Sequence, residues 1–380
     1  MRRTFATVLS SLTIGLALCG GALQQAHAAA APRYVATLVG ERGANATGLG
    51  LNNQGQVIGH LASLHGPAQG QAFVWDSQGG MRGLGTLGGI HSTAYDINDG
   101  GQVVGVYELS AGRTHAFIHN HAGMRALNIP GASSSSALGI NAKGHVTGGV
   151  TLDGGFRAPY IHDGSDVHVV GDGRCCLSGS AINDHGDMAV NNTQLGPFDL
   201  PLLQAFVYRN GELIELGTLS GGSNSVAADI NNRGQVVGWS NADNDLLDTR
   251  GFVWDEHSGM VDLSSFADGA VATSANAINE HGEVVGALRN HRPSSYSAYL
   301  YSDGIVIDLQ TRLDPRTGAN WLLNEARAIN DHGQIVVSAF DALTFDTATL
   351  LLTPVPEPQT LALLFAGLGV VLMRVRRRAV

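Results

Sequence analysis

The stretch Ile230-Asn231-Asn232-Arg233-Gly234-Gln235-Val236-Val237-Gly238 is one of seven copies of a short motif that decides the fold of this chain. Every copy keeps an asparagine and, three residues later, a glycine, at Asn52/Gly55, Asn98/Gly101, Asn141/Gly144, Asn183/Gly186, Asn231/Gly234, Asn279/Gly282 and Asn330/Gly333. Successive asparagines are 42 to 51 residues apart. A repeat of this length is typical of the blades of a β-propeller.

The Asn-x-x-Gly motif predicts a tight reversal between two antiparallel strands. The asparagine side chain can bind the backbone ahead of it, and glycine adopts the left-handed conformation that closes a type I turn with a bulge. Leu or Ile always precedes the asparagine directly. Three residues before this Leu or Ile, the chain always has Gly or Ala. This odd spacing predicts that the apolar and the small residues lie on opposite faces of the incoming strand.

Each repeat carries two further strands. One resembles Ala72-Phe73-Val74-Trp75, and its expected partner resembles Leu84-Gly85-Thr86-Leu87-Gly88-Gly89. Four strands in each of seven repeats would leave exposed edges in an open stack, and closure into a ring removes them. We therefore predict an all-β fold, a seven-bladed β-propeller of four-stranded blades in which the Leu-Gly-Thr-Leu strand comes first. An open β-solenoid is the alternative.

The N-terminal segment from Tyr34 to Gly40 fits the same position as the Leu-Gly-Thr-Leu strand. It either opens the first blade or completes a blade with the C-terminal strand. The phrases His-Ala-Phe (from His115), Leu-Gly-Thr-Leu-Gly-Gly and Ile-Asn-x-x-Gly-x-Val-Val-Gly together resemble the HAF family of extracellular repeats, over residues 34–352. Copies three, four and seven depart from that pattern, at Pro159, Val190 and Val337.

Both ends of the chain carry transport signals. Residues 1–28 have a basic start, an apolar run and Ala26-His27-Ala28, which predicts cleavage by signal peptidase after Ala28. Residues 354–380 contain Val355-Pro356-Glu357-Pro358, an apolar run from Leu361 to Met373, and a basic cluster made of Arg374, Arg376, Arg377 and Arg378. This order resembles the PEP-CTERM sorting signal.

That resemblance implies a protein of the Gram-negative envelope. It would be held briefly in the inner membrane by its C-terminal helix, cut by an exosortase, and then carried on the cell surface or secreted. A permanent single-span C-terminal anchor is the alternative.

The net charge of −10 excludes nucleic acid as an expected partner, because six of the arginines lie in the end signals and the middle of the chain is strongly acidic.

Cys19 leaves with the signal peptide. Cys175 and Cys176 are then either a vicinal disulfide or two thiols. We expect no metal and no cofactor. His185, His281 and His332 fall in separate turns, and the acidic loop of Asp243, Asp245 and Asp248 lacks the glycine and distal glutamate of a calcium loop.

In a propeller the Asn-x-x-Gly turns share one face, and the long, dissimilar loops share the other. Loops that differ between repeats mark the binding side of repeat proteins. The candidate ligand-binding residues on that face are Arg289, His291, Arg292, Tyr296, Arg312 and Trp321. Trp321 and Tyr296 lie beside arginines and could stack on sugar rings.

These observations predict a non-enzymatic envelope or matrix protein that binds exopolysaccharide or another surface component. No catalytic motif is visible among the loop residues. The alternative is an extracellular propeller enzyme, a polysaccharide hydrolase or lyase. It would require at least two acid or base residues that are not shared among the repeats, within ~10 Å of each other at the channel mouth.

Overall fold

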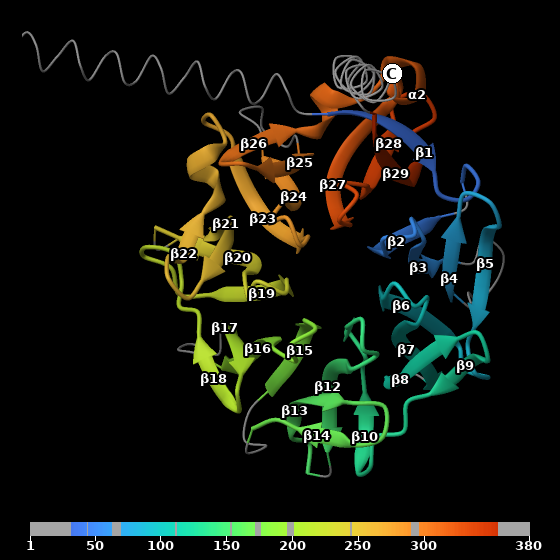
Figure 1. Cartoon of the computed structure of the whole chain (residues 1–380), viewed down its shortest axis with the longest axis vertical. Helices are drawn as coiled ribbons and strands as arrows, with labels where there is room; N and C mark the ends of the chain where they lie inside the picture. Colours follow the sequence, from blue (N-terminus) through green and yellow to red (C-terminus); the bar gives the residue numbers. More distant parts are fainter. Residues whose placement is uncertain are drawn as a thin grey trace, which may run out of the picture.

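The computed structural model describes residues 32–43, 45–62, 70–110, 112–152, 154–171, 176–195, 201–243, 245–289 and 296–355. The chain forms a closed ring of seven antiparallel sheets around a central channel, as Figure 1 shows. The prediction of an all-β seven-bladed propeller with four-stranded blades is confirmed, and the open solenoid is excluded.

The blades are numbered along the chain, and each is given from its innermost strand outward. Blades 1 and 2 are β2 (Ala46–Leu51), β3 (Val57–Leu61), β4 (Gln71–Asp76), β5 (Gly80–Gly85), and β6 (His91–Ile97), β7 (Val103–Ser110), β8 (Arg113–Asn120), β9 (Gly123–Ala126). Blades 3 and 4 are β10 (Ala132–Ser135) with β11 (Gly139–Ile140), β12 (Val146–Leu152), β13 (Arg157–His162), β14 (Val167–Val169), and β15 (Cys176–Ile182), β16 (Met188–Leu195), β17 (Pro201–Arg209), β18 (Glu212–Glu215).

The remaining three blades follow the same order. Blades 5 and 6 are β19 (Ser225–Ile230), β20 (Val236–Ala242), β21 (Asp245–Asp255), β22 (Gly259–Asp262), and β23 (Val271–Ile278), β24 (Val284–Arg289), β25 (Tyr296–Ser302), β26 (Ile305–Asp308). Blade 7 is β27 (Trp321–Ile329), β28 (Ile335–Asp341), β29 (Thr347–Val355) and β1 (Arg33–Leu38).

The order of strands within a blade differs from the prediction. The Ile-Asn strand is innermost, and the Leu-Gly-Thr-Leu strand is the outermost strand of the preceding blade. The N-terminal strand β1 therefore completes blade 7, pairing with β29 from Arg33 opposite Val355 to Leu38 opposite Leu350. Strands from the two ends of the chain thus close the ring, which removes the two edges that an open stack would expose.

The connection from blade 6 to blade 7 covers the outer edge of β1. It contains two single-turn helices, η3 (Leu309–Arg312) and α2 (Pro315–Gly318). Asp314 N donates to Tyr34 O at 2.8 Å, and Ala36 N donates to the Thr317 hydroxyl at 3.1 Å. Beyond β1, Arg42 pairs with Asp341 and lies over the Trp321 ring, 5.1 Å from its centroid. These contacts fasten the N-terminal strand to the C-terminal blade.

The seven repeated asparagines form a closed ring of hydrogen bonds around the channel. Each asparagine is 2–6 % exposed, and its Oδ1 accepts from backbone N–H groups of its own turn. Each Nδ2 also donates to the main-chain carbonyl of the next repeated asparagine, at 2.9–3.2 Å. The last of these bonds runs from Asn330 to Asn52 and joins the last repeat to the first. The conserved asparagine therefore links blades as well as shaping a turn.

The innermost strands carry a one-residue bulge that overturns the predicted alternation of faces. In blade 5 the register shifts between Ala227 and Asp229. Ala227 and Ile230 consequently pack in one hydrophobic cluster instead of on opposite faces. Corresponding shifts occur in blades 1, 2, 4, 6 and 7. A bulged residue interrupts the alternation of side chains between the two faces of a strand. The prediction that the apolar and the small residues lie on opposite faces was therefore wrong.

The second glycine of the motif is explained by a close approach of two backbones. A Cβ at Gly238 would lie 1.9 Å from Val226 O, and a Cβ at the equivalent glycines of blades 1, 2, 3 and 6 would meet a carbonyl oxygen at 1.8–2.1 Å.

Side chains fill the core between blades. Phe73, Phe117 and Phe252 are fully buried, and Trp75 and Trp254 are 5–6 % exposed. Trp239 is half-buried.

Both predicted end signals lie outside the described residues, except Val355 at the end of β29. This applies to Ala26, Ala28, Pro356, Glu357, Pro358 and the cluster of Arg374, Arg376, Arg377 and Arg378. Within the described ranges, no helix is long and apolar enough to span a membrane. Cys175 is likewise outside them, and Cys176 is exposed at the start of β15.

Candidate functional site

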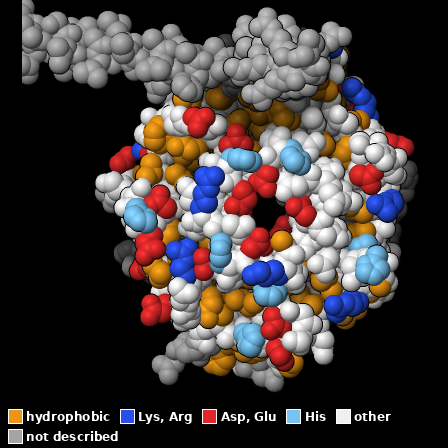
Figure 2. Space-filling model, in the orientation of Figure 1, with side chains coloured by type: hydrophobic (Ala, Val, Ile, Leu, Met, Phe, Trp, Pro, Cys, Tyr) orange, Lys and Arg blue, Asp and Glu red, His pale blue; other side chains and the backbone are white. Residues whose placement is uncertain are grey.

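An acidic rim surrounds one mouth of the central channel. The residue after each ring asparagine lies there, namely Asn53, Asp99, Ala142, Asp184, Asn232, Glu280 and Asp331. Figure 2 shows acidic side chains gathered around the central opening. In six of seven steps the backbone N–H of one rim residue donates to the side chain of the next, at 2.7–3.0 Å. The rim carboxylates therefore act as links between blades.

Two carboxyls that break the repeat lie deeper in the channel. Asp96 and Asp229 occupy a position where the other blades have Gly or Ala. Asp229 accepts from Ile230 N at 2.8 Å and, across the blade boundary, from Ile278 N at 3.0 Å. Burial raises the pKa of Asp229 to about 7 against these two donors, with smaller contributions from the charges of Asp96 and Glu280.

Asp96 has the same arrangement. It accepts from Ile97 N at 2.8 Å and from Ile140 N at 2.7 Å in blade 3. Burial raises the pKa of Asp96 to about 6, again opposed by the two backbone donors. Carboxyls that titrate near neutral pH inside a cleft are candidates for acid–base chemistry.

A pocket of about 620 Å³ opens on the long-loop face between blades 5, 6 and 7. Its lining combines two aromatic rings, several hydroxyls, an amide and a carboxylate, contributed by Trp239, Thr249, Thr273, Ser274, Ala287, Tyr296, Asn324, Glu325 and Ser338. Tyr296 is 53 % exposed. A concave site with a few convergent polar groups is the default place to look for a ligand.

The pocket and the channel share one wall. Glu325 lines the pocket, accepting from Asn276 Nδ2 at 2.9 Å and pairing with Arg327 Nη2 at 3.1 Å. Asn276 and Arg327 in turn line the channel together with Asp229. Among the residues that the structure describes, Arg327 Nε has no hydrogen-bond acceptor. Two donors thus hold Glu325, and both of them also line the channel with Asp229, whose pKa burial raises to about 7.

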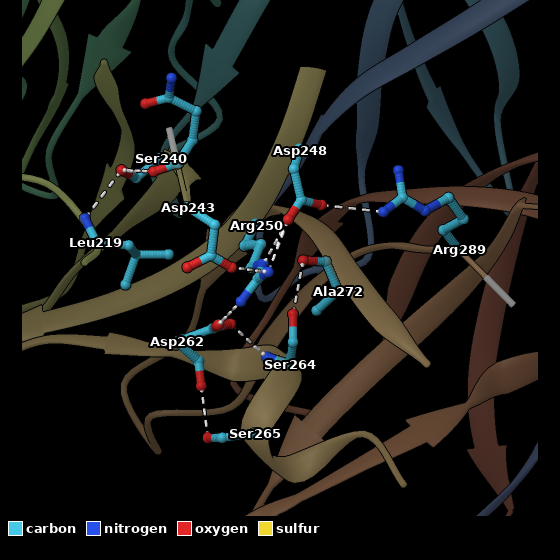
Figure 3. Close-up of polar contacts among 11 residues, drawn as sticks. Leu219, Ser240, Asp243, Asp248, Arg250, Asp262, Ser264, Ser265, Ala272 and Arg289 are labelled. Carbon is cyan, nitrogen blue, oxygen red and sulfur yellow. Dashed lines mark hydrogen bonds and ion pairs between the residues drawn. The ribbon is translucent and has the colours of Figure 1, made fainter. Parts of the chain in front are cut away.

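A cluster of ion pairs joins blades 5 and 6, and Figure 3 shows its contacts. Arg250 Nη2 donates to Asp243 Oδ2 and to Asp248 Oδ2, both at 2.7 Å, and Arg250 Nη1 donates to Asp262 Oδ2 at 3.2 Å. The second oxygen of Asp248 accepts from Arg289 at 3.1 Å. The two arginines hold the pKa of Asp248 below its usual value, although burial opposes the shift. The cluster ties the β20–β21 turn to β24 of blade 6.

The ligand-binding residues predicted from the sequence fall in different environments. Tyr296 lines the pocket, and Arg289 is bound to Asp248 beside it. Trp321 is only 7 % exposed under Arg42, so its ring is not offered to solvent as the prediction required. Arg312 is half-buried at the end of η3. His291 and Arg292 lie outside the described residues.

In the described part of the chain, no three His, Cys, Asp or Glu side chains converge to hold a metal ion. In the acidic loop, Asp243 and Asp248 are instead paired with Arg250.

The residues that sequence reasoning missed are Asp229, Asp96, Glu325 and Arg327. An alignment of the seven copies on the ring asparagine exposes three of them, because Asp96, Asp229 and Arg327 stand where other blades have small or apolar residues in most cases. Loop length, the signal that was used, does not detect residues on the innermost strands.

Two solved structures from Pyrococcus species are among those that resemble this chain. The first is the β-propeller domain of the Trilobed protease from Pyrococcus furiosus, with 11% identity, a TM-score of 0.56, and coverage of 83% of this chain and 95% of that one. The second is acylaminoacyl peptidase from Pyrococcus horikoshii, with 11% identity, a TM-score of 0.53, and coverage of 86% and 55%. The chain therefore spans about half the length of that peptidase.

No protein-family model matches the chain, and no curated relative matches it. At 11% identity the two solved structures establish the fold alone. Both belong to peptidases, and this finding corrects the prediction of a non-enzymatic matrix protein that binds exopolysaccharide.

Proposed function

We propose that this protein is an exported propeller enzyme that hydrolyses a polysaccharide at the pocket on the long-loop face. The observation that carries the proposal is that Glu325, which lines the pocket, is bound by Asn276 and Arg327, and that these two residues line the channel together with Asp229. The two carboxyls lie in different environments, because Glu325 is paired with Arg327 and burial raises the pKa of Asp229 to about 7.

Cleavage of a glycosidic bond by two carboxyls needs a proton donor and a base or nucleophile. Asp229 would donate its proton to the oxygen of the leaving sugar. Glu325, oriented by Arg327 and Asn276, would take a proton from the attacking water, which adds across the broken bond. Trp239 and Tyr296 would bind the sugar rings on either side of the bond.

The proposed location follows from the end signals. The apparent signal peptide and the PEP-CTERM-like tail support export and sorting by an exosortase, and the repeat phrases support a place among HAF-type extracellular proteins. Fractionation of producing cells tests the location. Recovery of the chain in the cytoplasm would contradict it.

An assay of released reducing ends tests the activity. The full chain is incubated with a panel of neutral, cationic and anionic polysaccharides, alongside Glu325→Gln and the control Glu212→Gln, whose side chain is exposed on the outer strand β18. We expect Glu325→Gln to lose roughly 100-fold or more of the rate, and Glu212→Gln to keep it. An inactive wild-type chain, or full activity in Glu325→Gln, would reject the proposal.

A further inference from the structure

The lining of the pocket indicates what kind of molecule fits it. Trp239 comes from β20 in blade 5 and Tyr296 from β25 in blade 6, so two planar rings from neighbouring blades meet one cavity. Between them lie hydroxyl and amide groups, from Thr249, Thr273, Ser274, Asn324 and Ser338. Flat apolar faces next to many hydrogen-bonding groups match a sugar ring, which has C–H faces and a hydroxyl edge.

The charge around the pocket selects among sugars. The described residues that line the pocket include one carboxylate, that of Glu325, and no Lys or Arg, while its partner Arg327 lines the channel. The channel continues to the acidic rim, where further carboxylates surround the far mouth. The chain as a whole has a net charge of −10. Such a field attracts cations and repels anions, most strongly in a cleft with low-dielectric walls.

We propose that the pocket takes a segment of an amino-sugar polymer with free, protonated amines. The sugar rings lie against Trp239 and Tyr296, and an amine points toward Glu325. This inference rests on the proposed function and narrows its substrate class.

The same charges argue against a lyase. Elimination from a sugar requires a carboxylate on the ring, which acidifies the neighbouring C–H bond. A polyuronate would bring that carboxylate next to Glu325 in a chain of net charge −10, where like charges repel. Hydrolysis adds only water and needs no such group on the substrate, so it is the reaction that this site favours.

Binding measurements with defined oligomers test the inference. The full chain is titrated with glucosamine oligomers, their N-acetylated counterparts, galacturonate oligomers and an oligolysine peptide, with tryptophan fluorescence or calorimetry as the readout. We expect the cationic sugar to bind roughly tenfold more tightly than the acetylated one at low salt, and the difference to shrink at high salt. Equal binding of acetylated sugar, tighter binding of galacturonate, or equal binding of oligolysine would overturn the inference.

Two variants locate the site. Tyr296→Ala and Trp239→Ala should each weaken binding of the glucosamine oligomer about fivefold. The control Phe345→Ala removes an aromatic ring that is 73 % exposed in the β28–β29 turn, away from the pocket, and should leave binding unchanged. Unaltered binding in Tyr296→Ala, whose exposed ring is not needed for folding, would refute the placement.

The outcome separates this inference from the proposed function. Cleavage of a neutral polysaccharide without preference for free amines would leave the enzyme in place and overturn the amino-sugar assignment. Tight, salt-sensitive binding of the glucosamine oligomer without release of reducing ends would support the assignment and reject the hydrolase.

Discussion

Substitution of one ring asparagine by alanine should destabilise the whole propeller. Asn231 is 2 % exposed and makes four hydrogen bonds. Its Oδ1 accepts from Arg233 N at 3.1 Å and Gln235 N at 3.0 Å, and its Nδ2 donates to Gln235 Oε1 at 2.9 Å and to Asn279 O at 3.1 Å. At ~1 kcal/mol for each bond, Asn231→Ala should lower the free energy of unfolding by about 4 kcal/mol.

The matched control is Asn120→Ala. Asn120 also shapes a turn, where its Oδ1 accepts from Ala122 N at 2.9 Å, but the residue is half-buried and no bond of this kind to another blade involves it in the described residues. We expect a loss of ~0.5 kcal/mol there. Asn330→Ala should match Asn231→Ala, although its interblade bond to Asn52 spans 278 residues of sequence. Urea unfolding measures all three. Losses within about 1 kcal/mol of one another for Asn231→Ala and Asn120→Ala would refute the role of the ring.

Three further predictions follow from the fold and the channel. Gly238→Ala places a Cβ 1.9 Å from Val226 O and should lower the free energy of unfolding by about 3 kcal/mol. In the control Gly79→Ala, the new Cβ meets only the flexible side chain of Asp76, so the loss of stability should be small. Equal losses in urea unfolding would contradict the close approach. Burial raises the pKa of Asp229 from 3.8 to about 7, so the contribution of this carboxyl to stability is complete below about pH 4 and is lost as the pH rises toward 7. Asp229→Ala should therefore flatten the decline of the free energy of unfolding over that pH range. Parallel curves of stability against pH for the wild type and the variant would argue against this role. Arg42→Ala should lower the midpoint of thermal unfolding, because it frees β1 from Trp321 and Asp341. The control Arg82→Ala loses one exposed ion pair with Asp76 and should leave the midpoint unchanged. Equal midpoints for the two variants would show that the N-terminal strand is held by its backbone pairing alone.

The fold was predictable because one motif repeats with its physics intact. The asparagine and glycine that shape the turn recur at a regular spacing, and they identify the number of blades. The interblade ring was not predictable, since it depends on the distance from Asn231 to Asn279 in space. The strand order was predicted one strand out of step, because a repeat in sequence does not show where one blade ends and the next begins.

The site was less predictable than the fold. Reasoning from loop length drew attention to Tyr296, which lines the pocket, and its role in binding stays a prediction. It also selected Trp321, which is buried because blade 7 needs a core residue under Arg42. Glu325 and Asp229 escaped notice because they lie on innermost strands, where a polar residue gains its meaning from the neighbouring blade.

The most direct test of the account is to let the wild-type chain act on a glucosamine polymer in heavy-oxygen water and to weigh the products by mass spectrometry. We predict that every new reducing end contains one heavy oxygen, because water adds across the glycosidic bond, and that Glu325→Gln yields no such product. Products without the label that carry a double bond, or no products at all, would contradict the hydrolase that we place at the shared wall of pocket and channel.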